Sequence, residues 1–197
     1  MELMEDIRGL NMQKNTYLEN KYELEDNIEK LPLRISETEK SIEGVAKDTE
    51  TIRNYKAPID ENGKEAFEMK VGNTVYTDKK EAAEALKSAM SKAIIGNPKK
   101  QTEIAEYKNF KIAVSYDSFT KSYIGCAKGA EKYPIEFGSS EIGNITRIDN
   151  VIASVPGRID NLCNALEFLK KQLSDSKAEV SRPFEHETEL EEKKQEL

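Results

Sequence analysis

Residues 3–52 read LMEDIRGLNMQKNTYLENKYELEDNIEKLPLRISETEKSIEGVAKDTETI. Apolar side chains recur in this stretch at seven-residue intervals, in two interleaved series that are apolar at eleven of fifteen positions if tyrosine is counted. A repeat sustained over this length predicts a coiled-coil helix rather than a short helix of a globular core. Pro32 removes a helical N–H and its ring clashes with a preceding carbonyl, so we expect a kink or break near Leu31.

A second seven-residue repeat lies near the C-terminus. The tetrapeptide Ser154-Val155-Pro156-Gly157 interrupts it and predicts a local restart of the helix, because proline fits the first helical turn. The two repeats occupy residues 1–55 and 144–197, and as helices both would be about 80 Å long at ~1.5 Å per residue. Matching lengths at the two ends of one chain favour an antiparallel hairpin; the alternative is that each helix pairs with a second copy or another protein. The apolar positions of the second repeat are Ile148, Ile152, Val155, Ile159, Leu162, Leu166, Leu169, Leu173 and Val180.

The middle of the chain changes from a seven-residue period to alternation. Apolar and charged residues alternate over 67–71, and the following Gly72-Asn73 predicts the tight turn of a β-hairpin. Thr77 or Asp78 can cap the next helix, which we expect to end near residues 96–98. Further strands, antiparallel to their neighbours because the turns between them are short, are expected at residues 104–107, 110–116, 123–127 and 133–137.

These patterns predict an α+β protein. Its two termini form a long antiparallel coiled-coil helical hairpin, and the inserted head domain is a small, mostly antiparallel sheet with one helix. The expected parts are an N-terminal helix over 1–55, kinked near Pro32, the head domain over 56–143, and a C-terminal helix with an acidic tail over 144–197. The chain ends within the repeat and without a capping residue, which indicates a piece of a longer polypeptide.

Charge is distributed unevenly along the 197 residues. The net charge is −7 and 34% of the residues are charged, which favours long solvated helices. Residues 1–55 carry 8 basic and 13 acidic groups, residues 56–143 carry 14 and 13, and residues 144–197 carry 8 and 11. No apolar run approaches the roughly 20 residues of a membrane-spanning helix, and the first residues are acidic where a signal peptide would be basic. We therefore expect a cytoplasmic protein with no membrane partner.

The sequence contains no motif that is typical of a catalytic site. It has no phosphate-binding loop, no dinucleotide fingerprint and no Cys/His spacing typical of a metal site. The one histidine, His186, lies in the acidic tail, and Cys126 and Cys163 are expected to be reduced, buried thiols. We expect no catalytic residue, no metal and no cofactor.

Lysines and aromatic residues are interleaved in the head domain. Lysines neutralise phosphates and exposed aromatic rings stack on bases, so this pattern allows contact with nucleic acid. The alternative is a solvated sheet whose aromatic residues form the core. The residues concerned are Lys79, Lys80, Lys99, Lys100, Lys108, Lys111 and Lys121, with Tyr107, Phe110, Tyr116, Phe119 and Tyr123.

Four segments, in this order, resemble the C-terminal region of very large helicase and adenine-methylase fusion proteins of bacterial conjugative elements and phages. They are residues 22–32, 71–86, 143–150 and 182–184, the last followed by an acidic helix. The resemblance implies a Swi/Snf-like helicase and a methylase upstream, with this chain as an accessory domain that has no turnover of its own. It departs from the family where Tyr107-Lys-Asn-Phe110 replaces the expected Tyr-x-Gly-Phe, although Asn also adopts the left-handed turn conformation.

Two functional hypotheses follow from the sequence. The first is a non-catalytic module that recognises or positions DNA, next to the upstream domains of the same polypeptide. The second is a scaffold whose helices dimerise or recruit a partner helix, without direct contact with DNA. In the segment 143–150, Asn144 is placed to cap the long helix, and Arg147 is either a structural joint or a DNA contact. The expected DNA-binding residues are Lys79, Lys80, Lys99, Lys100, Lys108, Lys111 and Arg147.

Overall fold

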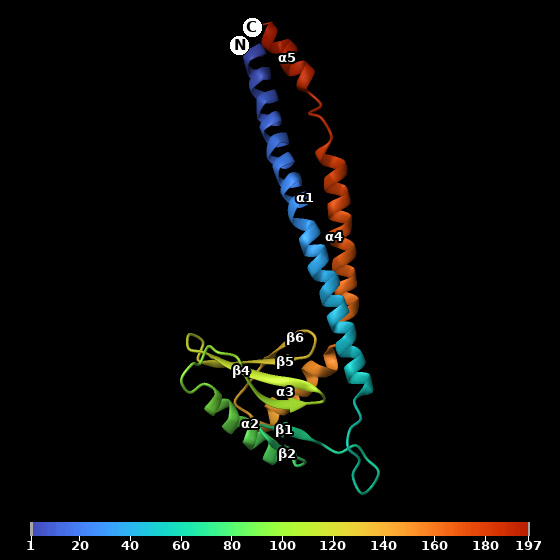
Figure 1. The fold of residues 1–197 in the computed structure, drawn as a ribbon. Helices are drawn as coiled ribbons and strands as arrows, with labels where there is room; N and C mark the ends of the chain where they lie inside the picture. The colour runs from blue at the N-terminus through green and yellow to red at the C-terminus, as the bar shows by residue number, and fades with distance from the viewer. Residues whose placement is uncertain (1, 197) are drawn as a thin grey trace. The chain divides into compact units, whose positions relative to one another are not determined.

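The computed structural model describes residues 2–196 and has an α+β fold (Figure 1). Helix α1 (Glu2–Asn54) packs against helix α4 (Arg158–Val180), and a six-stranded antiparallel sheet lies between them in the sequence. The chain divides into two compact units. Unit 1 comprises residues up to 40 together with those from 162 onward, and unit 2 comprises residues 41–161. Within residues 2–196, no helix has the length and apolar character needed to cross a bilayer.

Unit 1 is an antiparallel helical hairpin, as the seven-residue repeats predict. Lys193 pairs with Asp6 at 2.6 Å, and Lys170 pairs with Glu39 at 2.9 Å. An early residue of α1 thus pairs with a late residue of the chain, and a later residue of α1 pairs with an earlier one. Helix α1 is therefore antiparallel to α4 and to helix α5 (Glu187–Gln195). The repeat residues Leu10, Leu31 and Leu169, with Leu190 of α5, are buried between the helices.

Pro32 does not break α1, which is assigned as one helix on both sides of it. The proline is exposed, so the Ile28 carbonyl that loses its helical partner can be hydrated instead. The preceding Leu31 is only 1% exposed, and its burial against the rest of unit 1 stabilises the helical path. The expected break near Leu31 is therefore absent from this helix.

The sheet of unit 2 follows the predicted strands closely. Its spatial order is β2-β1-β3-β4-β5-β6, and every neighbouring pair is antiparallel. Gly72 has φ +58° in the first hairpin, where a left-handed residue is required. Lys108 and Asn109 have φ values of 48° and 66°, as the tight turn there demands. The strands are β1 (Met69–Val71), β2 (Thr74–Tyr76), β3 (Thr102–Tyr107), β4 (Phe110–Asp117), β5 (Ser122–Lys128) and β6 (Lys132–Glu136).

Two helices cover the sheet, where the sequence predicted one. Helix α2 (Lys79–Ala93) contacts β1 to β4, helix α3 (Glu141–Ser154) contacts β5 and β6, and the two helices contact each other. Residues 144–154 were expected to belong to the C-terminal coiled coil. They belong to unit 2 instead, because Ile145, Ile148 and Ile152 are buried against the sheet and its other helix.

The C-terminal stretch contains three helices rather than one. The predicted restart occurs where it was expected, since residues 155–157 form a turn between α3 and α4. A second interruption at 181–186 separates α4 from α5. The compact units accordingly divide after residues 40 and 161, whereas the sequence pattern suggested divisions after 55 and 143.

The last turns of α1 are part of unit 2 through a buried carboxylate. Asp48 is 2% exposed and accepts hydrogen bonds from the backbone N–H groups of Ala130 and Glu131, at 2.6 and 2.9 Å. The Tyr133 hydroxyl donates a third, at 2.6 Å. Because these donors lie in the β5–β6 turn and in β6, Asp48 fixes the end of α1 to that edge of the sheet.

Candidate nucleic-acid interface

The seven predicted DNA-contacting residues do not form one surface. Lys79 and Lys80 are exposed at the start of α2, directly after its cap Asp78. Lys99 and Lys100 are exposed in the loop that follows the same helix. The first pair begins this fifteen-residue helix and the second follows its end, and the helix itself is about 20 Å long at ~1.5 Å per residue.

Lys108 is engaged in a structural ion pair. Its Nζ lies 2.6 Å from Asp149 Oδ1 on α3 and 5.3 Å from the centre of the Tyr107 ring. The Tyr107 hydroxyl donates to the same carboxylate oxygen at 3.2 Å. Burial, reinforced by the charge of Asp149, raises the pKa of Tyr107. Lys108 therefore helps to attach the β3–β4 turn to α3.

Lys111 lies on the face of the sheet opposite the buried Phe110 and Ile112. Its Nζ is 3.4 Å from Glu103, and Lys128 approaches the same carboxylate at 3.5 Å. The hydrogen bond from Lys111, together with the two positive charges, lowers the pKa of Glu103. This carboxylate partly neutralises the positive charge available on this face.

Arg147 connects helix α3 to the end of strand β6. Its Nη1 donates to the Glu136 carbonyl at 3.1 Å, at the point where the chain leaves β6. Asn144, one turn earlier, accepts from the Gly138 N–H at 2.7 Å and donates back to the Gly138 carbonyl at 3.0 Å. The prediction that Asn144 caps a long helix is wrong, because Ser140 caps α3 and Asn144 lies inside it.

Lys99 and Lys100 lie beside the β4–β5 hairpin. The Tyr116 N–H donates to the Pro98 carbonyl at 2.8 Å, which joins the loop to the end of β4. The hairpin turn 118–121 contains Phe119, which is 95% exposed, and the exposed Lys121. We call this group the Phe119 end; it consists of Lys99, Lys100, Phe119 and Lys121.

The aromatic residues of the predicted cluster mostly serve the core. Phe110 is fully buried and Tyr107 is 8% exposed. Tyr116 and Tyr123 are partly buried and pack edge to face, with ring centres 5.3 Å apart. Phe119 is thus the member of the group that presents its ring to solvent. The sequence pattern includes Phe119 and Lys121 among the interleaved aromatic residues and lysines. It does not single them out, because the alternation of residue types does not show which aromatic ring is exposed.

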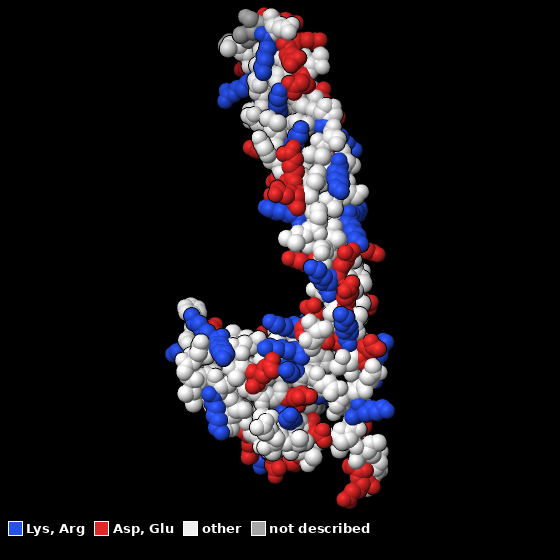
Figure 2. Space-filling model, in the orientation of Figure 1, with Lys and Arg blue, Asp and Glu red and all other residues white. Residues whose placement is uncertain are grey.

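Charge on the visible side of unit 2 is mixed. Figure 2 shows basic and acidic side chains interspersed over this unit, as expected from 14 basic and 13 acidic residues in 56–143. A contact with phosphate on this side of unit 2 would therefore involve a small group of lysines rather than a broad basic surface.

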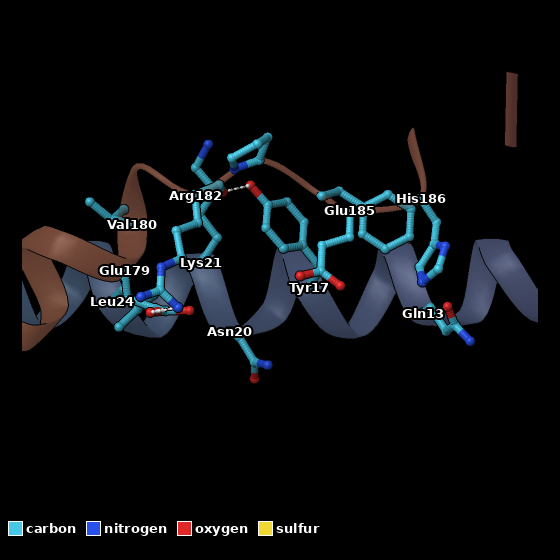
Figure 3. A pocket seen from close by; sticks show the side chains of 12 residues that line it. Gln13, Tyr17, Asn20, Lys21, Leu24, Glu179, Val180, Arg182, Glu185 and His186 are labelled. Atoms are coloured by element: carbon cyan, nitrogen blue, oxygen red, sulfur yellow. Dashed lines mark hydrogen bonds and ion pairs between the residues drawn. The ribbon is translucent and has the colours of Figure 1, made fainter. Parts of the chain in front are cut away.

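A cavity lies in unit 1, between α1 and the connection from α4 to α5 (Figure 3). It has a volume of about 400 Å³ and is open to solvent. Tyr17 donates to the Arg182 carbonyl at 2.8 Å and packs against Phe184, which holds the connection on α1. Arg182 is paired with Glu179 at 3.0 Å. The groove is explained by packing of the connecting segment and shows no convergent catalytic groups among its lining residues.

Of the two cysteines and the histidine, Cys126 belongs to unit 2, whereas Cys163 and His186 belong to unit 1. Cys126 is buried in β5, whereas Cys163 is exposed on α4 rather than buried as expected. The ring of His186 contacts Glu189 at 3.0 Å, one turn along the chain. Over residues 2–196, no three His, Cys, Asp or Glu side chains are grouped as a metal site would require.

Comparisons of this chain with protein-family models, with curated proteins and with solved structures found no match.

Proposed function

We propose that this chain is a non-catalytic accessory module that recognises or positions DNA through the Phe119 end. The observation that carries the proposal is the combination of three exposed lysines with a 95% exposed phenylalanine on two adjacent loops. Lysines neutralise phosphates, and the ring supplies an apolar contact surface. The resemblance of four segments to helicase and methylase fusion proteins is in keeping with the proposal, because a chain of that family would follow two domains that act on DNA.

In this proposal the seven predicted residues have different roles. Lys99 and Lys100 contact phosphate, joined by Lys121. Lys108 and Arg147 serve the structure, since Asp149 and the Glu136 carbonyl accept from them. Lys111 is paired with Glu103 on the face of the sheet and is likewise not a phosphate contact in this proposal. Lys79 and Lys80 lie at the other end of α2 and contribute little.

The test is fluorescence anisotropy with labelled duplex and single-stranded DNA at low and moderate salt. We expect binding that weakens with salt and is lost in a Lys99→Glu/Lys100→Glu variant. The matched control is Lys79→Glu/Lys80→Glu, which changes the net charge equally at the other end of α2. Equal losses from the two variants, or no binding by the folded protein at low salt, would contradict the proposal.

A second candidate function, a protein-interaction scaffold, is favoured by one observation on α1. Leu18, Tyr22 and Leu33 are 39%, 71% and 65% exposed. At 3.6 residues per turn they share a face that points away from the buried Leu10 and Leu31. Analytical ultracentrifugation tests this role. Association that depends on concentration and is abolished by a Tyr22→Glu substitution would support it. A protein that is monomeric at all concentrations would contradict self-association through this face.

A further inference from the structure

The turn that carries Phe119 is held in one conformation by Asp117. The Asp117 carboxylate accepts the Phe119 N–H at 2.9 Å and the Thr120 hydroxyl at 2.9 Å. Thr120 also shares a hydrogen bond with Ser122 at 2.7 Å, across the base of the turn. These bonds, with a smaller contribution from Lys99, lower the pKa of Asp117. The Phe119 ring is therefore presented by an ordered turn, so that binding through it loses little conformational entropy.

Exposed lysines lie on the loop that carries this ring and on the adjoining loop. Lys99 lies close enough to Asp117 for its charge to act on that carboxylate, and Lys100 follows it in the same loop. Lys121 comes two residues after Phe119, in the left-handed conformation with φ 52°. Lys99 thus acts on Asp117, whose oxygens already accept hydrogen bonds within the turn, and Lys100 and Lys121 are exposed on the same two loops. The two loops therefore offer an exposed apolar ring together with exposed cationic groups.

We propose that Phe119 stacks on an unpaired base while Lys99, Lys100 and Lys121 bind the adjacent phosphates, so that the preferred ligand is single-stranded nucleic acid. This inference rests on the proposed function and narrows it. In a duplex the base faces are covered by their neighbours and only edges are exposed in the grooves. A ring that projects from a turn reaches a base face without the cost of unstacking a duplex only where the strand is unpaired.

The chain has no tryptophan, so a single introduced indole reports on this contact. In a Phe119→Trp variant, stacking on a base quenches indole fluorescence when a single-stranded oligonucleotide is added. The control is Phe168→Trp, because Phe168 is also exposed, at 67%, but lies on α4 in unit 1. We expect strong quenching in the first variant by single strands, weaker quenching by a duplex of the same length, and none in the control.

Affinity gives a second, independent readout. Replacing a stacking ring by alanine weakens single-strand binding by about tenfold or more, so Phe119→Ala should show such a loss while Phe119→Tyr retains affinity. Phe168→Ala should leave binding unchanged. Three neutralised phosphates give a slope of about −2 in log affinity against log salt for a single strand, which Phe119→Ala should not alter.

The outcomes separate the two proposals. Equal affinity for duplex and single strand, unaffected by Phe119→Ala but reduced by Lys99→Glu/Lys100→Glu, would overturn stacking and leave DNA binding in place. No binding to either nucleic acid would overturn both. A blue shift of the indole with phosphatidylserine-containing vesicles, without any response to oligonucleotide, would overturn the inference in favour of an anionic lipid surface.

Discussion

Asp48 is the residue on which the packing of unit 2 depends most directly. Its carboxylate is almost fully buried and is fully used, by two backbone N–H groups and one tyrosine hydroxyl. The backbone at Gly129 runs so close to Asp48 that a Cβ there would collide with the carboxylate. The arrangement satisfies a turn that would otherwise leave two backbone donors without an acceptor.

Substitution of Asp48 by alanine should lower the free energy of unfolding by about 3 kcal/mol or more, because three partly or fully buried donors lose their acceptor. Urea unfolding followed by circular dichroism measures the change. Glu50→Ala is the control, since Glu50 is exposed two residues later on the same helix. A loss below about 1 kcal/mol for Asp48→Ala would show that water or another group replaces the carboxylate.

Two tyrosines make unit 2 sensitive to alkaline pH. Burial raises the pKa of Tyr133, with further contributions from its hydrogen bond to Asp48 and the charge of that group. Burial and Asp149 likewise raise the pKa of Tyr107. The folded state therefore keeps these protons above pH ~10, where the unfolded chain releases them. Their contribution to stability is complete below pH ~10 and is lost as pH rises toward the folded-state pKa values.

We expect the unfolding midpoint in urea to fall as pH is raised above about 10. In a Tyr133→Phe variant the midpoint should be lower at neutral pH and should fall less steeply with pH, because one of the two linked protons is gone. Tyr22→Phe is the control, as Tyr22 is 71% exposed. Parallel pH profiles for Tyr133→Phe and the unaltered protein would contradict this linkage.

At the scale of elements, the helices of unit 2 are defined by their first turns. Asp78 caps α2 by accepting from the N–H groups of Lys80 and Glu81, both at 2.9 Å. Ser140 caps α3 by accepting from Gly143 at 3.1 Å. Because α2 and α3 contact each other and together reach every strand, the start of each helix determines which apolar residues meet the sheet.

Removal of the α2 cap should cost about 1 kcal/mol of stability, so Asp78→Ala should lower the melting temperature by several degrees. Asp78→Ser retains a side-chain acceptor and should restore most of the loss. Differential scanning calorimetry of the two variants and the unaltered protein provides the comparison. Equal melting temperatures for Asp78→Ala and Asp78→Ser would show that the cap bond does not matter.

At the scale of the whole molecule, the hairpin of unit 1 is held mainly by apolar burial. Its ion pairs are largely exposed, and pairs of this kind contribute about 0–1 kcal/mol each. Leu31 of α1 is 1% exposed, whereas Leu33, two residues later and across Pro32, is 65% exposed. These two leucines distinguish the buried seam from the outer face of one helix.

Leu31→Ala should destabilise unit 1 by about 3 kcal/mol, and Leu33→Ala by less than about 0.5 kcal/mol. Thermal unfolding followed by circular dichroism measures both. Light scattering on the same samples gives the mass. Similar effects of the two substitutions would mean that Leu33 is also buried in solution, which would strengthen the scaffold function.

The elements were predictable to a large extent because their signals are local. The hairpin at Gly72-Asn73, the cap at Asp78 and the turn at Asn109 each follow from the backbone preferences of a few adjacent residues. The α+β class and the antiparallel helical hairpin follow from the change between a seven-residue period and alternation. The role of α3 was not predictable from periodicity, because the isoleucines of a coiled-coil seam and those of a sheet-covering helix have the same spacing.

The candidate site was predictable in composition but not in position. The sequence contains Lys99, Lys100, Phe119 and Lys121, together with other lysines and rings of the same kinds. Local pattern alone determined the strands, helix α2 and the number of basic and aromatic groups, since these depend on neighbours along the chain. The folded structure decided that Phe110 is buried, that Lys108 and Arg147 hold α3, and that Phe119 projects beside three lysines. Those outcomes depend on which strands pair and which helix covers them, and such contacts join residues far apart in the sequence.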